Sequence, residues 1–308
     1  MILSIDLNPV VKRKYNLGDI ELYNLNMAET VNYGPGGYGI ELAYFLSGLN
    51  ENVIVSGFLG GVNGNFIEKE LHEAHIINEF YRIKDETADS IIISTNNGDT
   101  QINTRGPRIT RDELGGYIEH YNRLIFGAEI ICIAGNMTNN ISKDIYYDLV
   151  KRGGQLNKKV LIALGGDELY YALEGAPYLA VIQRQELENL TKLKLDYEYE
   201  IIKAGQYILD KGVSIVVIPV DNKGSIVLTT EYIYRVNVPE IDIQPCSVNN
   251  GYMLGGFSLS IERNYDFDMM LRIGQSCGII NCYKHNSSID MSDIKRIMGE
   301  IEIGRYNH

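Results

Sequence analysis

Patterns typical of buried strands and of helices alternate along almost the whole of this chain. The expected strands are short apolar runs rich in β-branched residues: Ile2–Ile5, Val53–Phe58, Ile130–Ala134, Val160–Leu164, Tyr178–Ile182 and Ile215–Val220. The expected helices are Ile40–Leu46, Asn65–Ala74, Arg111–Leu124, Ser142–Arg152, Glu168–Leu173, Glu198–Lys211, Tyr252–Glu262, Asp268–Tyr283 and Ser292–Ile301. This order predicts an α/β fold of three layers, in which helices cover a mostly parallel sheet.

Two segments break the alternation. Tyr15–Tyr33 is polar and interrupted, as in small exposed strands, and the runs Ser90–Ser94 and Thr100–Asn103 form a hairpin signal across Asn96–Asp99. We interpret them as one small separate sheet, built from about 14–33 and 90–103, within a single domain of residues 1–308. The runs Tyr232–Val236 and Ile241–Ile243 add two short expected strands before the last helices.

Composition restricts the choice of partner. The 308 residues are 45% hydrophobic and 22% charged, and 28 Lys and Arg against 40 Asp and Glu give a net charge of −12. Nucleic acids and anionic membranes need a basic surface, so neither is expected as the main partner. A small phosphorylated ligand remains compatible, because it needs only a local pocket of cations or amides.

The cysteines and the N-terminal residues favour a cytoplasmic protein. The four cysteines show no spacing typical of a metal site, and Cys132 lies in an apolar run that predicts a buried, reduced thiol. Residues Met1–Asp6 have neither the basic head of a signal peptide nor an apolar span long enough for a membrane helix.

The stretch Cys246–Phe257 predicts a loop that leads into a helix. Its small polar residues leave backbone N–H groups free at the helix start, where the helix dipole favours an anion. An ordinary helix N-terminus capped by an asparagine explains the same pattern.

Several motifs together identify a family. Asp6–Pro9, Pro35–Ile40 and Gly57–Gly64 resemble the ribokinase-like carbohydrate kinases, most of all the branch of 1-phosphofructokinase and tagatose-6-phosphate kinase. The match continues at Ile102–Asn103, Gly106–Pro107, Gly135, Glu186, Gly212–Val213, Gly224 and Ser247–Val248, and it runs from Ile2 to about Ile303. The resemblance implies the three-layer fold with a β-sheet lid over the sugar site. It further implies ATP and Mg²⁺ as cofactors, a phosphorylated sugar or nucleotide as ligand, and a homodimer through the lids, as in some relatives.

On the sugar side, the sequence departs from the family pattern. The family Asp that holds sugar hydroxyls falls at Lys12, and the motif Gly-Gly-Lys-Gly-x-Asn reads Gly36–Glu41. Tyr38 therefore replaces the Lys that binds the sugar phosphate, Glu41 replaces the sugar-binding Asn, and the phosphate-binding Arg of the hairpin falls at Ala88. The resemblance assigns to the substrate site Asp6, Lys12, Gly36, Gly37, Tyr38, Glu41 and Asn103.

The nucleotide and catalytic motifs are altered too. Asn-x-x-Glu reads Gln183–Glu186 and keeps only the metal-associated Glu, while a glycine of the nucleotide loop falls at Asp221. The catalytic Asp of Gly-Ala-Gly-Asp falls on Gly251 or Tyr252, depending on where the motif is anchored. The resemblance assigns to the nucleotide site Gln183, Asp221, Gly224, Asn249, Asn250 and Gly251, and to the metal Glu186.

These departures leave three hypotheses. Loss of a general base typically costs about 10²–10⁴ in rate, so the chain is first expected to be an inactive relative that binds a ligand or assembles. The second hypothesis is an active sugar or sugar-phosphate kinase with Asp6 or Glu41 as a relocated base. The third is a different reaction in the same cleft.

The exchanged charges predict one contact. A lysine turned into a partly dry cleft is costly unless it is paired, so we expect the Lys12 ammonium within about 4 Å of Glu41 or Asp6. The alternative is that Lys12 points to water. We further expect the Tyr38 ring over the space that a sugar phosphate takes in active relatives.

Overall fold

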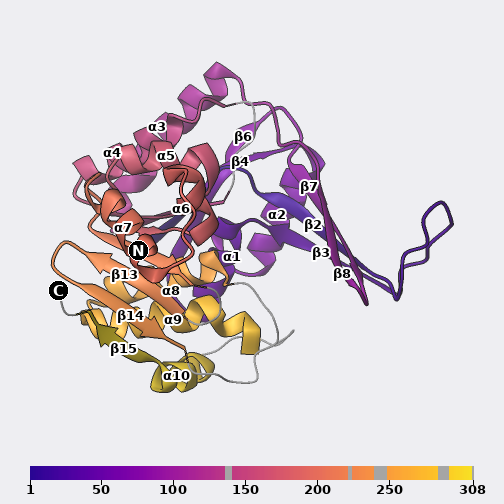
Figure 1. Ribbon diagram of the computed structural model, residues 1–308. Coiled ribbons are helices and arrows are strands. Elements are labelled where there is room, and N and C mark those ends of the chain that lie inside the picture. Colours follow the sequence, from indigo (N-terminus) through magenta and orange to yellow (C-terminus); the bar gives the residue numbers. More distant parts are fainter. Residues whose placement is uncertain (136–140, 221–223, 239–247, 284–290, 307–308) are drawn as a thin grey trace.

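The computed structural model describes residues 1–135, 141–220, 224–238, 248–283 and 291–306, and it is built around one large sheet (Figure 1). Its 11 strands run in the order β15-β14-β13-β12-β11-β10-β9-β1-β4-β5, with β6 paired to β4. Their bounds are β1 (Ile2–Asp6), β4 (Val53–Gly60), β5 (Ile77–Asn78), β6 (Tyr81–Ile83), β9 (Ile130–Ala134), β10 (Lys159–Ala163), β11 (Leu179–Val181), β12 (Ile215–Pro219), β13 (Gly224–Thr229), β14 (Ile233–Asn237) and β15 (Glu302–Arg305). The pairs from β5 and β6 to β12 are parallel, and those from β12 to β15 are antiparallel.

Two apolar clusters lie on the two faces of this sheet, because successive strand residues point to opposite sides. Ile2, Ile130 and Cys132 join one cluster, and Leu3 and Ile131 join the other. The first cluster is covered by α1 (Tyr38–Gly48), α2 (Gly61–Glu73), α8 (Asn250–Glu262), α9 (Phe267–Tyr283) and α10 (Met291–Glu300). The second is covered by α3 (Arg111–Gly127), α4 (Ile145–Gln155), α5 (Gly166–Glu174), α6 (Arg184–Thr191) and α7 (Glu198–Leu209). The predicted three-layer α/β arrangement is confirmed.

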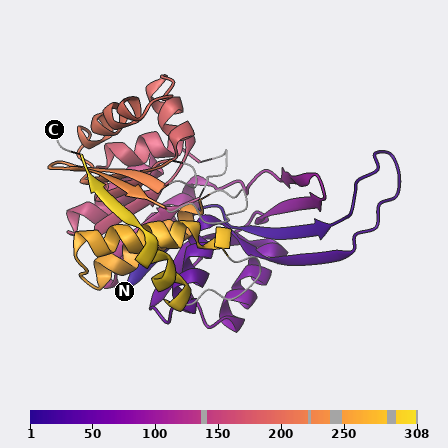
Figure 2. The same cartoon turned by 60° about the horizontal axis from the view of Figure 1, so that its bottom comes forward.

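A separate four-stranded sheet stands to one side, as predicted. Its order is β3-β2-β7-β8, with strands β2 (Val10–Asn16), β3 (Thr30–Gly36), β7 (Ala88–Thr95) and β8 (Gly98–Asn103). Strands β2 and β7 begin before the expected positions 14 and 90, where Val11 and Ala88 are still buried against the rest of the protein. The loop between β2 and β3 projects beyond this small sheet (Figures 1 and 2).

Local features missed by the sequence patterns have tertiary causes. Helix α2 begins at Gly61 rather than near Asn65, because the Glu86 carboxylate accepts the backbone N–H groups of Val62 and Asn63 and so caps the extended first turn. Strand β15 is short and polar, and its strand conformation comes from pairing with β14 at the sheet edge. The expected strand Ile241–Ile243 lies outside the described residues. No helix within the described ranges is both long and apolar enough to cross a bilayer.

Two helical glycines give opposite predictions for alanine. A Cβ at Gly256 on α8 would lie 2.7 Å from Cys277 Sγ and 3.0 Å from the Ile273 carbonyl oxygen, both on α9, so Gly256→Ala should lower the free energy of unfolding by about 1–3 kcal/mol. At Gly115 on α3 a Cβ meets nothing within 4 Å, so Gly115→Ala should raise it by about 0.5–1 kcal/mol. Urea denaturation of both variants checks this, and equal effects would contradict the α8–α9 packing.

Candidate functional site

A cleft of about 570 Å³ opens between the small sheet and the carboxyl end of β1. Strand β1 lies between β4 and β9, where the chain order reverses, and this is the usual place of a ligand crevice in open α/β sheets. The core side of the cleft is formed by Asp6, Asn8, Gly37, Tyr38, Glu41 and Gly135, and the small sheet and the segment after it contribute Val10, Lys12, Ser90, Ile92, Gln101, Asn103, Thr104, Arg105 and Gly106. The cleft therefore contains every residue that the resemblance assigns to the substrate site except Gly36.

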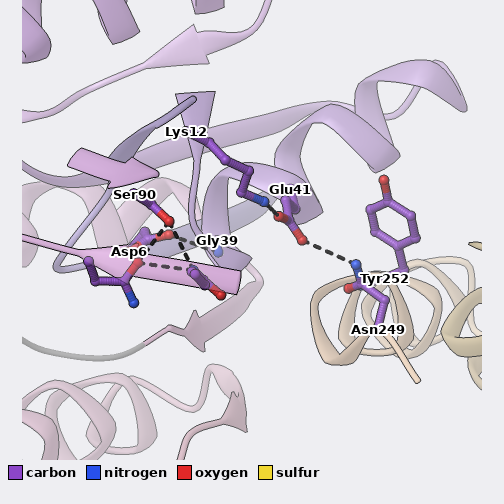
Figure 3. Close-up of polar contacts among 9 residues, drawn as sticks. Asp6, Lys12, Gly39, Glu41, Ser90, Asn249 and Tyr252 are labelled. Atoms are coloured by element: carbon purple, nitrogen blue, oxygen red, sulfur yellow. Dashed lines mark hydrogen bonds and ion pairs between the residues drawn. The ribbon is translucent and has the colours of Figure 1, made fainter. Parts of the chain in front are cut away.

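Glu41 on α1 is the centre of the polar contacts in the cleft. Its Oε1 lies 2.6 Å from the Lys12 ammonium on β2, and its Oε2 accepts a 3.1 Å hydrogen bond from the Asn249 side-chain amide (Figure 3). Gly36 permits this approach, since a Cβ there would lie 3.0 Å from Lys12 Cε. The predicted Lys12 ion pair is confirmed, with Glu41 as its partner.

Asp6 is a fully buried carboxyl at the end of β1. Its Oδ2 accepts the Gly39 amide at 3.0 Å and its Oδ1 accepts the Asn8 amide at 3.2 Å. Burial, opposed in part by these hydrogen bonds, raises the pKa of Asp6 to about 7. The space around the carboxyl is tight: a Cβ at Gly37 would overlap it, and one at Gly135 would lie 3.1 Å from Oδ1.

The two candidate positions for a catalytic Asp lie in the first turn of α8. A Cβ on Gly251 would lie only 2.7 Å from the Tyr38 carbonyl oxygen, so α1 packs against this glycine. Tyr252 stacks on Phe45 with ring centroids 4.9 Å apart, and burial raises the pKa of its hydroxyl. Asn249 accepts the Tyr252 amide at 2.9 Å and is the side-chain cap of the helix. The capping interpretation of this asparagine is confirmed.

The small sheet adds uncharged polar groups to the cleft. Asn103 Oδ1 accepts hydrogen bonds from Ser90 Oγ at 2.8 Å and from the Gln101 amide at 3.0 Å. Ala88 is buried in β7, so no cation occupies that position. Tyr38 lines the cleft, and its place over a sugar phosphate stays a prediction.

That the residues assigned to the nucleotide form one site stays a prediction. Gln183 is the N-cap residue of α6, Gly224 begins β13, and Asp221 lies outside the described residues. Asn250 begins α8, and its buried Oδ1 has no hydrogen-bond partner in the part of the chain that the structure describes.

Glu186 offers little as a metal ligand by itself. Its Oε2 accepts the Gly166 amide at 2.7 Å and so caps α5. Over the described ranges no three His, Cys, Asp or Glu side chains are grouped as a metal site. Mg²⁺ bound with ATP needs only one or two protein carboxylates beside phosphate oxygens, so the other oxygen of Glu186 fits that limited role.

Sequence reasoning missed Asn249 as the partner of Glu41, because the two residues are 208 positions apart. The only local signal was an asparagine before a helix, and this signal predicts the cap alone. It also missed Arg105, which follows the hairpin and lines the cleft.

The family model described as "pfkB family carbohydrate kinase" matches residues 2–294. The chain belongs to this family.

Its fold matches phosphofructokinase-2 from Escherichia coli with a TM-score of 0.89 at 19% identity, covering 97% of this chain and 98% of the other. A protein of Thermotoga maritima described as a candidate 1-phosphofructokinase matches with a TM-score of 0.87 at 21% identity, covering 99% of both chains. A candidate phosphofructokinase from Staphylococcus aureus matches with a TM-score of 0.84 at 22% identity, covering 100% of this chain and 99% of the other. These likenesses show the ribokinase-like fold.

The raised pKa of Asp6 gives a pH-dependent stability. Between about pH 4 and pH 7 this carboxyl is ionised in the unfolded chain and still protonated in the folded one, because folding raises its pKa from 3.8 to about 7. Folding then takes up a proton, so the Asp6 contribution to the free energy of unfolding falls as pH rises through this window. Urea denaturation at several pH values should show a steeper fall for the wild type than for Asp6→Asn. Equal slopes would contradict the assignment.

Proposed function

We propose that this chain is a pfkB-family protein that no longer phosphorylates a hexose phosphate and instead serves as a ligand-binding or assembly protein. The observation that carries the proposal is the state of Glu41. Both of its carboxylate oxygens are engaged, one by Lys12 and the other by Asn249. A group that the resemblance assigns to sugar binding thus holds the cleft together.

The altered cleft is poorly suited to a sugar phosphate. Phosphate recognition relies on charge-assisted hydrogen bonds from Lys or Arg. The Lys12 ammonium is neutralised by Glu41 at 2.6 Å, and the family positions for the phosphate-binding Lys and Arg hold Tyr38 and Ala88. Arg105 lines the cleft and is exposed. Solvent and salt would therefore weaken the attraction between its guanidinium and a phosphate.

The residues at the position of the catalytic base also support a chain without kinase activity. Removal of the acceptor proton by a positioned group contributes about 10²–10⁴ in rate, and neither Gly251 nor Tyr252 supplies a carboxylate there. An Asp introduced at Gly251 would have its Cβ 2.7 Å from the Tyr38 carbonyl oxygen, so the helices would have to move apart to accept it.

One observation favours the alternative of an active kinase. The pKa of Asp6 is raised to about 7 by burial, and a general base works best with a pKa near the working pH. ATP and Mg²⁺ would then be the cofactors, and a hexose phosphate the acceptor, as fructose 6-phosphate is bound in a solved complex of the E. coli phosphofructokinase-2. Against this role, both Asp6 oxygens accept backbone amides and the side chain is fully buried.

A turnover assay tests the proposal. With Mg-ATP, neither fructose 1-phosphate nor tagatose 6-phosphate should increase ADP release above the rate with Mg-ATP alone. Gly251→Asp should not restore activity, because the phosphate-binding cations are also absent. A turnover of about 1 s⁻¹ or faster would reject the proposal, and its loss in Asp6→Asn would then support Asp6 as the base.

Assembly through the small sheet is the second part of the proposal. The loop between β2 and β3 exposes five large apolar side chains, Ile20, Leu22, Tyr23, Leu25 and Met27, with exposed fractions from 45% to 103%. The loop projects away from the rest of the protein (Figure 2). A group of exposed apolar side chains on such a loop supports an interaction site there. A homodimer through this sheet would cover it, and one solved structure of the E. coli phosphofructokinase-2 is described as a tetrameric inhibited form.

The oligomeric state should depend on this loop. We expect the wild type to sediment as a dimer, and the double variant Leu22→Asp, Leu25→Asp to sediment as a monomer with unchanged circular dichroism, because both side chains are solvent-exposed in one chain. Val62→Asp, an equally exposed apolar residue on α2, is the matched control and should remain dimeric. A monomeric wild type would contradict this part of the proposal.

A further inference from the structure

A second cavity, of about 480 Å³, lies between the end of α6, the following loop and one face of α7. It shares no lining residue with the cleft at β1. We call it the α6–α7 pocket. It is lined by Leu190, Thr191, Leu193, Lys194, Leu195, Tyr199, Glu200, Lys203, Ala204 and Tyr207. Its volume falls within the range of small-molecule sites, about 300–1,000 Å³.

The loop that follows α6 forms one wall of the pocket and is fixed by backbone contacts. Lys192 ends α6 in the left-handed conformation with φ 59°, which turns the chain away from the helix. The Leu195 amide donates to Glu188 Oε1 at 3.0 Å and fixes the loop against α6. Leu195 and Ala204 are buried and form the floor. The shape of the pocket therefore exists before any ligand arrives.

The rim of the pocket is apolar and exposed. Leu193 is 60% exposed, and the rings of Tyr199 and Tyr207, which lie two turns apart on α7, are 66% and 49% exposed. An isolated exposed apolar residue is ordinary, but several around a preformed hollow are typical of a binding site.

The charges of the pocket favour an anion. The Glu200 carboxylate accepts two hydrogen bonds at the N-terminus of α7. Its Oε2 accepts the Tyr197 amide at 2.9 Å, and its Oε1 accepts the Tyr199 hydroxyl at 3.3 Å. Lys194 and Lys203 have no ion-pair or hydrogen-bond partner among the residues that the structure describes. Two unpaired lysines beside an apolar hollow are notable in a chain with a net charge of −12.

We propose that the α6–α7 pocket binds a small amphipathic anion, with an aliphatic or aromatic body on Leu195 and Ala204 and a carboxylate or sulfonate on Lys203 and Lys194. The apolar body of such a ligand would cover the exposed side chains of Leu193, Tyr199 and Tyr207. Its anionic head would pair with the two lysines. This inference does not rest on the function proposed for the cleft.

Anilinonaphthalene sulfonate is a suitable probe, because it joins an aromatic body to one negative charge and fluoresces in apolar sites. We expect the wild type to bind one equivalent, and Lys203→Glu to weaken this binding at least tenfold. Lys295→Glu, the same change at an exposed position of α10, is the matched control and should leave it unchanged. Octanoate should displace the probe, and octylammonium, which has the same apolar body with the opposite charge, should not.

A second variant covers the apolar contact. Leu193→Asp changes an exposed rim residue, so the fold should be retained while the affinity for the probe falls at least tenfold. Three results would overturn the proposal: unchanged affinity in Lys203→Glu and Leu193→Asp, equal displacement by octylammonium, or a loss of binding in Arg105→Glu, which would place the probe in the cleft at β1.

Discussion

The Glu41 carboxylate joins three parts of the molecule that are far apart in the sequence. It lies on α1, receives Lys12 from the small sheet and receives Asn249 from the start of α8. The same Asn249 caps α8, so a change at Glu41 would reach the first turn of that helix. Charge-assisted hydrogen bonds in a partly buried site are among the stronger polar contacts, and here they hold the small sheet close to the core.

The Asp6 carboxyl is also removed from water, but backbone amides bind it in place of a lysine. Its carboxyl is fully buried and has no ion-pair partner within the described ranges, and two backbone amides replace the water that it has lost. The surrounding glycines leave room only for this carboxyl and the backbone that binds it. A buried acid with a raised pKa is common at catalytic sites, but burial alone raises the pKa of a structural carboxyl in the same way. Both oxygens of Asp6 accept backbone amides, and these hydrogen bonds oppose the rise.

Sequence patterns predicted the architecture well because it depends on periodicity. The alternation of buried runs and amphipathic helices predicted the three layers. The resemblance placed Lys12 in a partly dry cleft, and the cost of an unpaired lysine there predicted its ion pair. Contacts that depend on tertiary packing could not be predicted from the sequence. The bond between Asn249 and Glu41 needs the crossing of α1 and α8, and the α6–α7 pocket needs the left-handed turn at Lys192.

The glycines of the family motifs persist here for reasons that do not involve catalysis. Gly37 has φ 123°, a conformation that favours glycine, and any side chain at this position would overlap the Asp6 carboxyl. Gly224 has φ 124°, and a Cβ there would overlap the Val236 carbonyl oxygen of the neighbouring strand. The fold itself requires these glycines, because a side chain fits neither beside the Asp6 carboxyl nor against the Val236 carbonyl oxygen. The glycines of the motifs therefore indicate the fold of the family, whereas the charged residues of the cleft decide its chemistry.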